Sequence, residues 1–245
     1  MLAFLFWDPY FWVTIPGMLL AMWAQFKLSS TYHRYAQVGT GRRVTGAQAA
    51  RHILDRNGLH DVEIYETPGH LTDHYDPSKR TVFLSQANYH DASLAAVGVA
   101  AHEVGHALQH QLRYGPLGLR MAMVGVTNFA SKLSWILIMG GFLLASASKA
   151  AGGGLGQKLL VGGIGLFSLV VFFQLVTLPV EYDASRRAKL ELERLGLVLP
   201  DERGGVARVL NAAALTYVAA MVTAMLELLR LVLLARSFGS SDDDR

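Results

Sequence analysis

The sequence predicts a mainly helical α+β membrane protein, with about four transmembrane helices and a small cytoplasmic unit built from a helix and a β-hairpin. Three observations support this prediction. Hydrophobic residues make up 52% of the 245-residue chain and charged residues only 17%, below the quarter that is typical of soluble domains. Four apolar segments are long enough to cross about 30 Å of hydrocarbon, which takes roughly 20 residues. Between the first two segments lies a polar region with helical and then strand-like periodicity.

The apolar segments are expected to form the membrane part of the protein. They cover residues 2–26, 124–147, 159–180 and 212–234. The first has no basic stretch before it and no small-residue cleavage site after it, so we expect a retained anchor and not a secretory signal. The fourth carries Glu227 and Arg230, which are three residues apart and can pair on one helix face. We expect this fourth segment to be a span, with a buried helix as the alternative.

The basic residues predict how the chain is oriented. Lysines and arginines gather in residues 27–120 and 181–210, whereas the loop after the second span has only Lys149 and Lys158. By the positive-inside rule, the two basic stretches face the cytoplasm. We therefore interpret the net charge of +3 as a sign of membrane topology, with the lipid bilayer as a partner and no nucleic acid.

The polar region begins with a helix and a short strand. Thr45 and Gln48 have the spacing of a capping box, and Asn57 with Gly58 ends the helix that follows. Val62 and Ile64 then indicate a short strand.

A β-hairpin and a second helix are predicted next. Residues 71–75 and 80–84 flank a turn at Asp76-Pro77-Ser78-Lys79, which is typical of a hairpin. In residues 93–111 apolar side chains recur at spacings of three and four, and Asp91 or Ser93 can cap this helix.

The second predicted helix contains a metal-binding motif. His102, Glu103 and His106 form an H-E-x-x-H motif, and two histidines four residues apart lie on one helix face, where both imidazoles can reach one zinc ion. Glu103, beside the first histidine, can take a proton from a zinc-bound water. The chain has no cysteine, which excludes thiolate ligands and disulfides. The motif therefore predicts one catalytic zinc ion.

A catalytic zinc usually has three protein ligands, and Glu181 is the favoured third one. It follows Pro179, which permits the third span to end or kink, and the topology returns it to the side of the two histidines. Asp183 is the rival ligand. His110 is excluded as the third ligand if the helix is unbroken, because it lies about 12 Å along the axis from His102 at 1.5 Å per residue. His70 and His74 are expected near the cleft.

Several stretches together resemble the YugP-like membrane neutral zinc metallopeptidases of bacteria and, more distantly, the HtpX-type and prenyl-protein-processing membrane zinc proteases. The stretches are residues 6–9, 68–77, 100–110, 178–181 and 209–217. The resemblance implies a zincin-like catalytic unit in which His102, His106 and Glu181 bind zinc and Glu103 is the base. The distant relatives have an aspartate where this chain has Ser185, so support for a ligand histidine is expected from Asp183, Asn211 or another group.

The predicted function is that of a membrane-bound zinc metalloendopeptidase, which hydrolyses peptide bonds of protein or peptide substrates at the cytoplasmic face. Tyr217, His74 and Tyr182 are candidates for stabilising the oxyanion, and an exposed edge of the hairpin is a candidate for binding an extended substrate. The alternatives are a zinc-stabilised adaptor or chaperone without turnover, an intramembrane metalloprotease and, with thinner support, a transporter. Substrate identity and oligomeric state do not follow from the residues.

This reading divides the chain into five segments. They are an anchor (1–26), a catalytic region (27–120), a transmembrane hairpin (121–180), a second cytoplasmic segment with the third ligand (181–210), and a fourth transmembrane helix with its tail (211–245).

Overall fold

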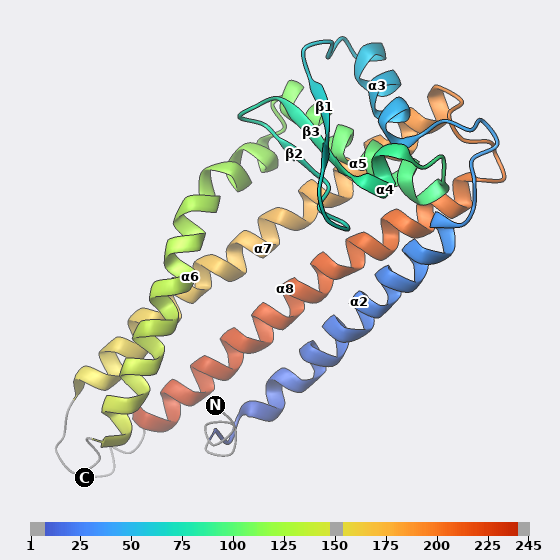
Figure 1. The fold of residues 1–245 in the computed structure, drawn as a ribbon. Helices are drawn as coiled ribbons and strands as arrows, with labels where there is room; N and C mark the ends of the chain where they lie inside the picture. The colour runs from blue at the N-terminus through green and yellow to red at the C-terminus, as the bar shows by residue number, and fades with distance from the viewer. Residues whose placement is uncertain (1–7, 148–153, 240–245) are drawn as a thin grey trace. The chain divides into compact units, whose positions relative to one another are not determined.

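The computed structural model describes residues 8–147 and 154–239, and it is mainly helical with one small sheet (Figure 1). In chain order the elements are η1 (Phe11–Thr14), α2 (Ile15–Ala36), α3 (Gly46–Arg56), β1 (Glu63–Thr67), β2 (His74–Asp76), β3 (Thr81–Ser85), α4 (Gln86–His90), α5 (Leu94–Gln111), α6 (Gly115–Ala147), α7 (Gly154–Arg194) and α8 (Arg203–Gly239).

The chain divides into two compact units. One comprises the described parts of Met1–Met22, Leu119–Val176 and Val218–Arg245, and the other comprises Trp23–Gly118 and Thr177–Tyr217. We call them the helical unit and the mixed unit. Helices α2, α6, α7 and α8 each run through parts of both.

The sheet of the mixed unit has three strands in the order β1-β3-β2. β2 and β3 pair in antiparallel register, with Tyr75 opposite Val82, which confirms the predicted hairpin. β1 confirms the predicted strand and pairs with β3 in parallel, a pairing that the sequence analysis did not anticipate. Every residue of β3 except Phe83 is buried, as expected for the central strand.

Helices α3 and α5 confirm the predicted helices of this unit and pack on its core. The capping box at Thr45 and Gln48 is present, with the threonine hydroxyl accepting from the Gln48 N–H and the Gln48 side chain accepting from the Thr45 N–H. Ser93 caps α5 by accepting a hydrogen bond from the N–H of Ala96. Most of α5 is buried, so the H-E-x-x-H motif lies on a helix enclosed by its own unit.

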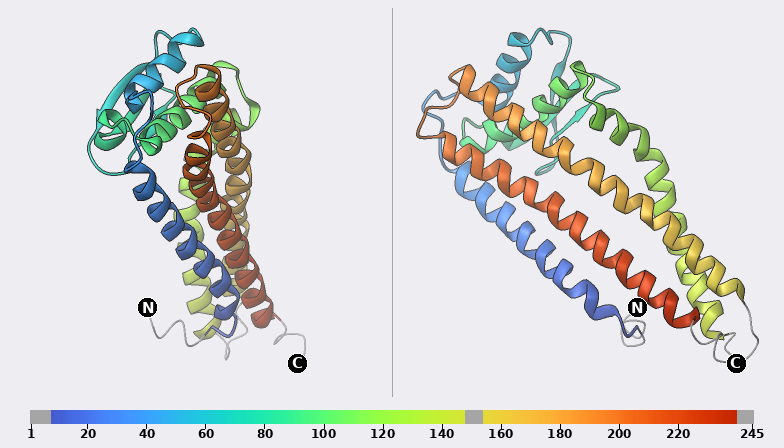
Figure 2. Two further views of the ribbon diagram at one scale, coloured as in Figure 1. Left: turned by 90° about the vertical axis from the view of Figure 1, so that its right-hand side faces the viewer. Right: turned by 180° about the vertical axis from the view of Figure 1, so that it is seen from behind.

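The helical unit is held by apolar packing of α6, α7 and α8 around Ile138, Phe167 and Leu231. Helices α6 and α7 approach closely at glycines: a Cβ on Gly156 would lie 2.5 Å from the backbone nitrogen of Ala145. Small residues permit such backbone approach, which is how helices pack in lipid. Figure 2 shows these helices in two further views.

In the described part of the helical unit, buried Arg230 lies between two carboxylates, one buried and one half-buried. Arg230 contacts the carboxylates of both Glu227 and Asp8. The predicted pairing of Glu227 with Arg230 is therefore confirmed, and Asp8 adds a second carboxylate from a distant part of the chain.

Three of the described helices are long and apolar enough to cross a membrane: Gly115–Ser146, Gly154–Arg194 and Arg203–Ser237. They contain the second, third and fourth predicted spans. The first predicted span begins in residues outside the described ranges, and its described part is not among the three. Helix α7 also differs from expectation, because it continues through Pro179 to Arg194 instead of ending near Glu181.

Candidate metal centre

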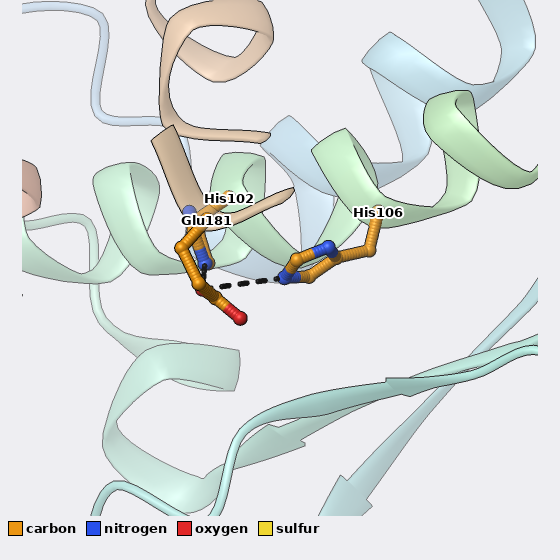
Figure 3. Close-up of side chains that lie close together, drawn as sticks. All are labelled: His102, His106 and Glu181. Carbon is orange, nitrogen blue, oxygen red and sulfur yellow. Dashed lines mark hydrogen bonds and ion pairs between the residues drawn. The ribbon is translucent and has the colours of Figure 1, made fainter. Parts of the chain in front are cut away.

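Helices α5 and α7 bring together the side chains of His102, His106 and Glu181 (Figure 3). The Nε2 atoms of His102 and His106 lie 3.2 and 3.7 Å from Oε2 of Glu181. One ligand atom from each residue lies within 4.8 Å of the other two. The sequence separation between the first histidine and the glutamate is 79 residues, so this cluster depends on the packing of two helices.

Close packing at Gly105, inside the H-E-x-x-H motif, explains why the two helices meet here. A Cβ on Gly105 would lie 2.5 Å from the carbonyl oxygen of Ala184, which is closer than any real side chain tolerates. Only glycine allows α5 to approach the backbone of α7 at this point. Glu181 lies one turn before Ala184 on α7, so this close approach brings its carboxylate to the two imidazoles.

Ser185 contacts the other nitrogen of His102. Its Oγ lies 3.1 Å from Nδ1 of His102. If Nδ1 carries the proton and donates to this hydroxyl, Nε2 keeps its lone pair on the side of Glu181. Serine thus makes the contact for which the sequence analysis had proposed Asp183, Asn211 or another group, so the aspartate-to-serine difference leaves a hydrogen-bond partner in place.

Gln109 has the corresponding contact with His106 and was missed by the sequence analysis. Its Oε1 lies 3.0 Å from Nδ1 of His106, and its Nε2 donates to the carbonyl oxygen of Val180 at 2.7 Å and to Oδ2 of Asp183 at 3.0 Å. The side chain is completely buried, and both of its amide hydrogens are used. The available signal in the sequence was the spacing: a glutamine three residues after the second histidine lies on the same helix face.

Asp183, the rival ligand, lies outside the cluster and is engaged elsewhere. Besides the bond from Gln109, its carboxylate pairs with the guanidinium groups of Arg186 and Arg187. Its role in the structure is to hold Gln109, which in turn contacts His106.

Glu103 is buried beside the cluster, with 8% of its surface exposed. Burial raises the pKa of this carboxyl, and the charges of Glu181 and Asp73 act in the same direction, against the lowering effect of His102 and His106. For His106, burial lowers the pKa, but the contact with Glu181 outweighs it and raises the pKa above its usual value.

The donor set fits a zinc ion. In a tetrahedral site with bonds of 2.0–2.1 Å, ligand atoms lie roughly 3.3 Å apart. The Nε2 atoms of the two histidines lie 3.2 and 3.7 Å from Oε2 of Glu181. Two imidazoles and one carboxylate match zinc's preference for nitrogen and oxygen ligands when no thiolate is present. With Nε2 of each ring facing the metal, Nδ1 of His102 donates to the hydroxyl of Ser185 and Nδ1 of His106 donates to the amide oxygen of Gln109. Such partners orient zinc-binding histidines.

The other histidines singled out from the sequence are not part of this cluster. His110 lies 3.0 Å from the hydroxyl of Tyr75 through its Nδ1, which links α5 to strand β2. His74 stacks on Phe83, and His70 packs edge-on against Tyr32. Among the oxyanion candidates, Tyr182 is exposed.

Asp73 anchors the segment between β1 and β2. Its carboxylate accepts hydrogen bonds from the N–H and hydroxyl of Ser85 and from the side-chain amide of Asn88. The Asn88 amide oxygen in turn accepts from the hydroxyl of Tyr32 on α2, whose pKa burial raises to about 12. This network ties the segment before β2 to the end of β3, to α4 and to α2.

Comparison with known proteins identifies the family of this chain. The sequence model of a family described as "Putative neutral zinc metallopeptidase" matches residues 10–236. The chain belongs to this family. It is also 48% identical over 226 residues to the "Putative membrane protease YugP" of Bacillus subtilis (strain 168), covering 92% of this chain and 96% of that protein. The predicted resemblance is confirmed. No solved structure matches the chain.

Proposed function

We propose that the protein is a membrane-bound zinc metalloendopeptidase that hydrolyses peptide bonds of protein substrates at the cytoplasmic membrane face. The observation that carries the proposal is the buried cluster of His102, His106 and Glu181 with Glu103 beside it. In this assignment the two histidines and Glu181 hold one zinc ion. The family description and the name of the Bacillus relative support the same reaction.

The roles of the residues follow from their chemistry. A zinc ion in this site supplies a Lewis acid that polarises the scissile carbonyl and lowers the pKa of a water ligand to about 7. Glu103 accepts a proton from the attacking water and later delivers it to the leaving amine. Ser185 and Gln109 hold the imidazole rings so that their Nε2 atoms face the same point.

Replacing Glu103 by glutamine tests the proposal, since the amide keeps the shape and loses the base. We expect the purified variant to retain one zinc per chain and to lose cleavage of an unfolded protein such as casein by about 10²–10⁴-fold. Glu66→Gln, at an exposed carboxylate of β1, is the matched control and should cleave normally. Undiminished cleavage by the Glu103 variant contradicts the proposed base. A cellular role that survives this change would favour an adaptor without turnover.

The ligand assignment has its own test. His102→Ala, His106→Ala and Glu181→Ala should each lower the zinc content of the purified protein, measured by elemental mass spectrometry. Full zinc retention in Glu181→Ala would exclude that residue as a ligand and return the choice to another carboxylate.

We propose a topology of four spans, with residues 27–120 and 181–210 in the cytoplasm. The chain has no native cysteine, so single cysteines report their location without background. Ser78→Cys, in the exposed turn of the hairpin, should be protected from a membrane-impermeant maleimide in intact cells and react after lysis. Labelling in intact cells would place the hairpin outside.

We further propose that substrate binds in extended form along β2. In the described sheet β2 pairs with β3 on one side only, so its other edge has free backbone groups. The contact between Tyr75 of β2 and His110 of α5 keeps this edge near the helix that carries the motif. Proline substitutions through β2 should raise KM at the position whose N–H faces outward. Unchanged KM at every position of β2 would refute strand addition.

A further inference from the structure

A basic groove lies in the mixed unit between the last turns of α2 and the first turns of α8. Its volume is about 650 Å³, and three of the residues that line it are cations: Lys27, Arg34 and Arg208. None of its lining residues is acidic. Hydroxyl and amide groups from Ser30 and Asn211 add hydrogen-bonding capacity.

The cations of this groove are available to a ligand. Within the described ranges none of the three pairs with a carboxylate, whereas Arg51 and Arg80 of the same unit each do. All three residues are also exposed, so a ligand in the groove can reach their charged groups. Three uncompensated cations in one concave site favour an anion with several acceptor oxygens, such as a phosphate.

Tyr35 positions two of the cations. This buried tyrosine accepts a hydrogen bond of 2.7 Å from Nη1 of Arg208, and the guanidinium carbon of Arg34 lies 5.7 Å from the centre of its ring. One buried aromatic side chain therefore orients arginines from both helices. Such support distinguishes the groove from a set of freely moving surface charges.

The surface next to the groove is apolar. Trp23 and Phe26, in the turns of α2 just before Lys27, are 53% and 72% exposed. Leu215 and Ala212 of α8 line the groove itself. A ligand that satisfies both parts has an anionic head and an apolar body, and a tryptophan beside basic residues is typical of a membrane–water interface.

We propose that this groove binds the phosphate headgroup of an anionic phospholipid, whose acyl chains lie along Trp23 and Phe26. The inference rests on the proposed topology, in which α2 belongs to the first span, but not on catalytic activity. Lys27, Arg34 and Arg208 would contact the phosphate oxygens, and Ser30 and Asn211 would contact the glycerol part of the headgroup. Basic pockets between transmembrane helices on the cytoplasmic side bind anionic lipids in this way.

The test uses the full chain in detergent, with phosphatidylglycerol or phosphatidylcholine added and bound lipid counted by native mass spectrometry. We expect saturable binding of phosphatidylglycerol in preference to phosphatidylcholine. In the double variant Lys27→Gln/Arg34→Gln the affinity should fall by more than tenfold, because each basic residue near an anionic surface contributes about fivefold. The matched control Arg56→Gln/Arg113→Gln removes the same charge from exposed positions outside the groove and should bind phosphatidylglycerol normally.

Each other outcome overturns the proposal. Equal losses in the groove variant and the control would mean general attraction to the charged protein surface. Equal binding of the two lipids would mean that the phosphate of an anionic headgroup is not recognised. Displacement of the lipid by millimolar inorganic phosphate would make the ligand a free anion. Failure of the unmodified chain to enter detergent micelles or nanodiscs would contradict the membrane assignment and the lipid site with it. Thermal unfolding of both double variants checks that each is folded.

Discussion

Gln109 links the second histidine of the motif to helix α7, so replacing it by alanine tests how the metal centre is held. Gln109→Ala removes the acceptor for Nδ1 of His106 and the two donors to Val180 and Asp183. Each such bond contributes about 0.5–1.5 kcal/mol, and a buried partner left unsatisfied costs more. The free energy of unfolding should therefore fall by about 2–4 kcal/mol.

The zinc affinity of this variant should fall as well, because the His106 ring loses the contact that fixes its orientation. Loss of an outer hydrogen-bond partner weakens metal binding by about 10–100-fold. The assay is chelator competition on the purified protein in detergent, with thermal unfolding measured in parallel.

The matched control is Gln111→Ala, two residues further along the same helix. Gln111 is exposed, and its side-chain amide donates to the backbone oxygen of Asn57, away from both histidines of the motif. It should keep the zinc affinity of the unmodified protein. If Gln109→Ala binds zinc as tightly as the control does, the argument that Gln109 orients the ligand is wrong.

Three further substitutions probe the same centre. Gly105→Ala places a Cβ 2.5 Å from the Ala184 carbonyl oxygen and should lower the free energy of unfolding by about 1–3 kcal/mol. The control Gly118→Ala has open space around the new Cβ and should unfold at or above the temperature of the unmodified protein. Ser185→Ala removes the contact with the first histidine and should weaken zinc binding by about 10-fold in the chelator assay, and an unchanged affinity would rule this contact out as a support. Asp73→Asn disturbs the bonds that anchor the hairpin and should lower stability by about 1.5–3 kcal/mol in thermal unfolding; an unaltered transition would contradict that role.

Local patterns along the chain were sufficient for helices α3 and α5 and for the three strands of the mixed unit, whereas the short helix α4 was not predicted. The capping box at Thr45, the cap at Ser93 and the hairpin turn after Tyr75 each depend on residues within a few positions of one another. Such interactions are encoded in short stretches, so they could be predicted before any tertiary contact was known. The continuation of α7 through Pro179 was not predictable in the same way, because a proline in an apolar helix permits either a stop or a continuation.

The sequence by itself determined that His102 and His106 share a helix face, since a spacing of four is a property of the helix alone. Only the tertiary structure decided which carboxylate lies against them, because Glu181 belongs to another helix and follows His102 by 79 residues in the sequence. The close approach at Gly105 brings that helix near, and this approach also assigns Ser185 and Gln109 to the two imidazoles. Contacts between distant segments depend on how whole helices pack, and no short stretch of sequence carries that information.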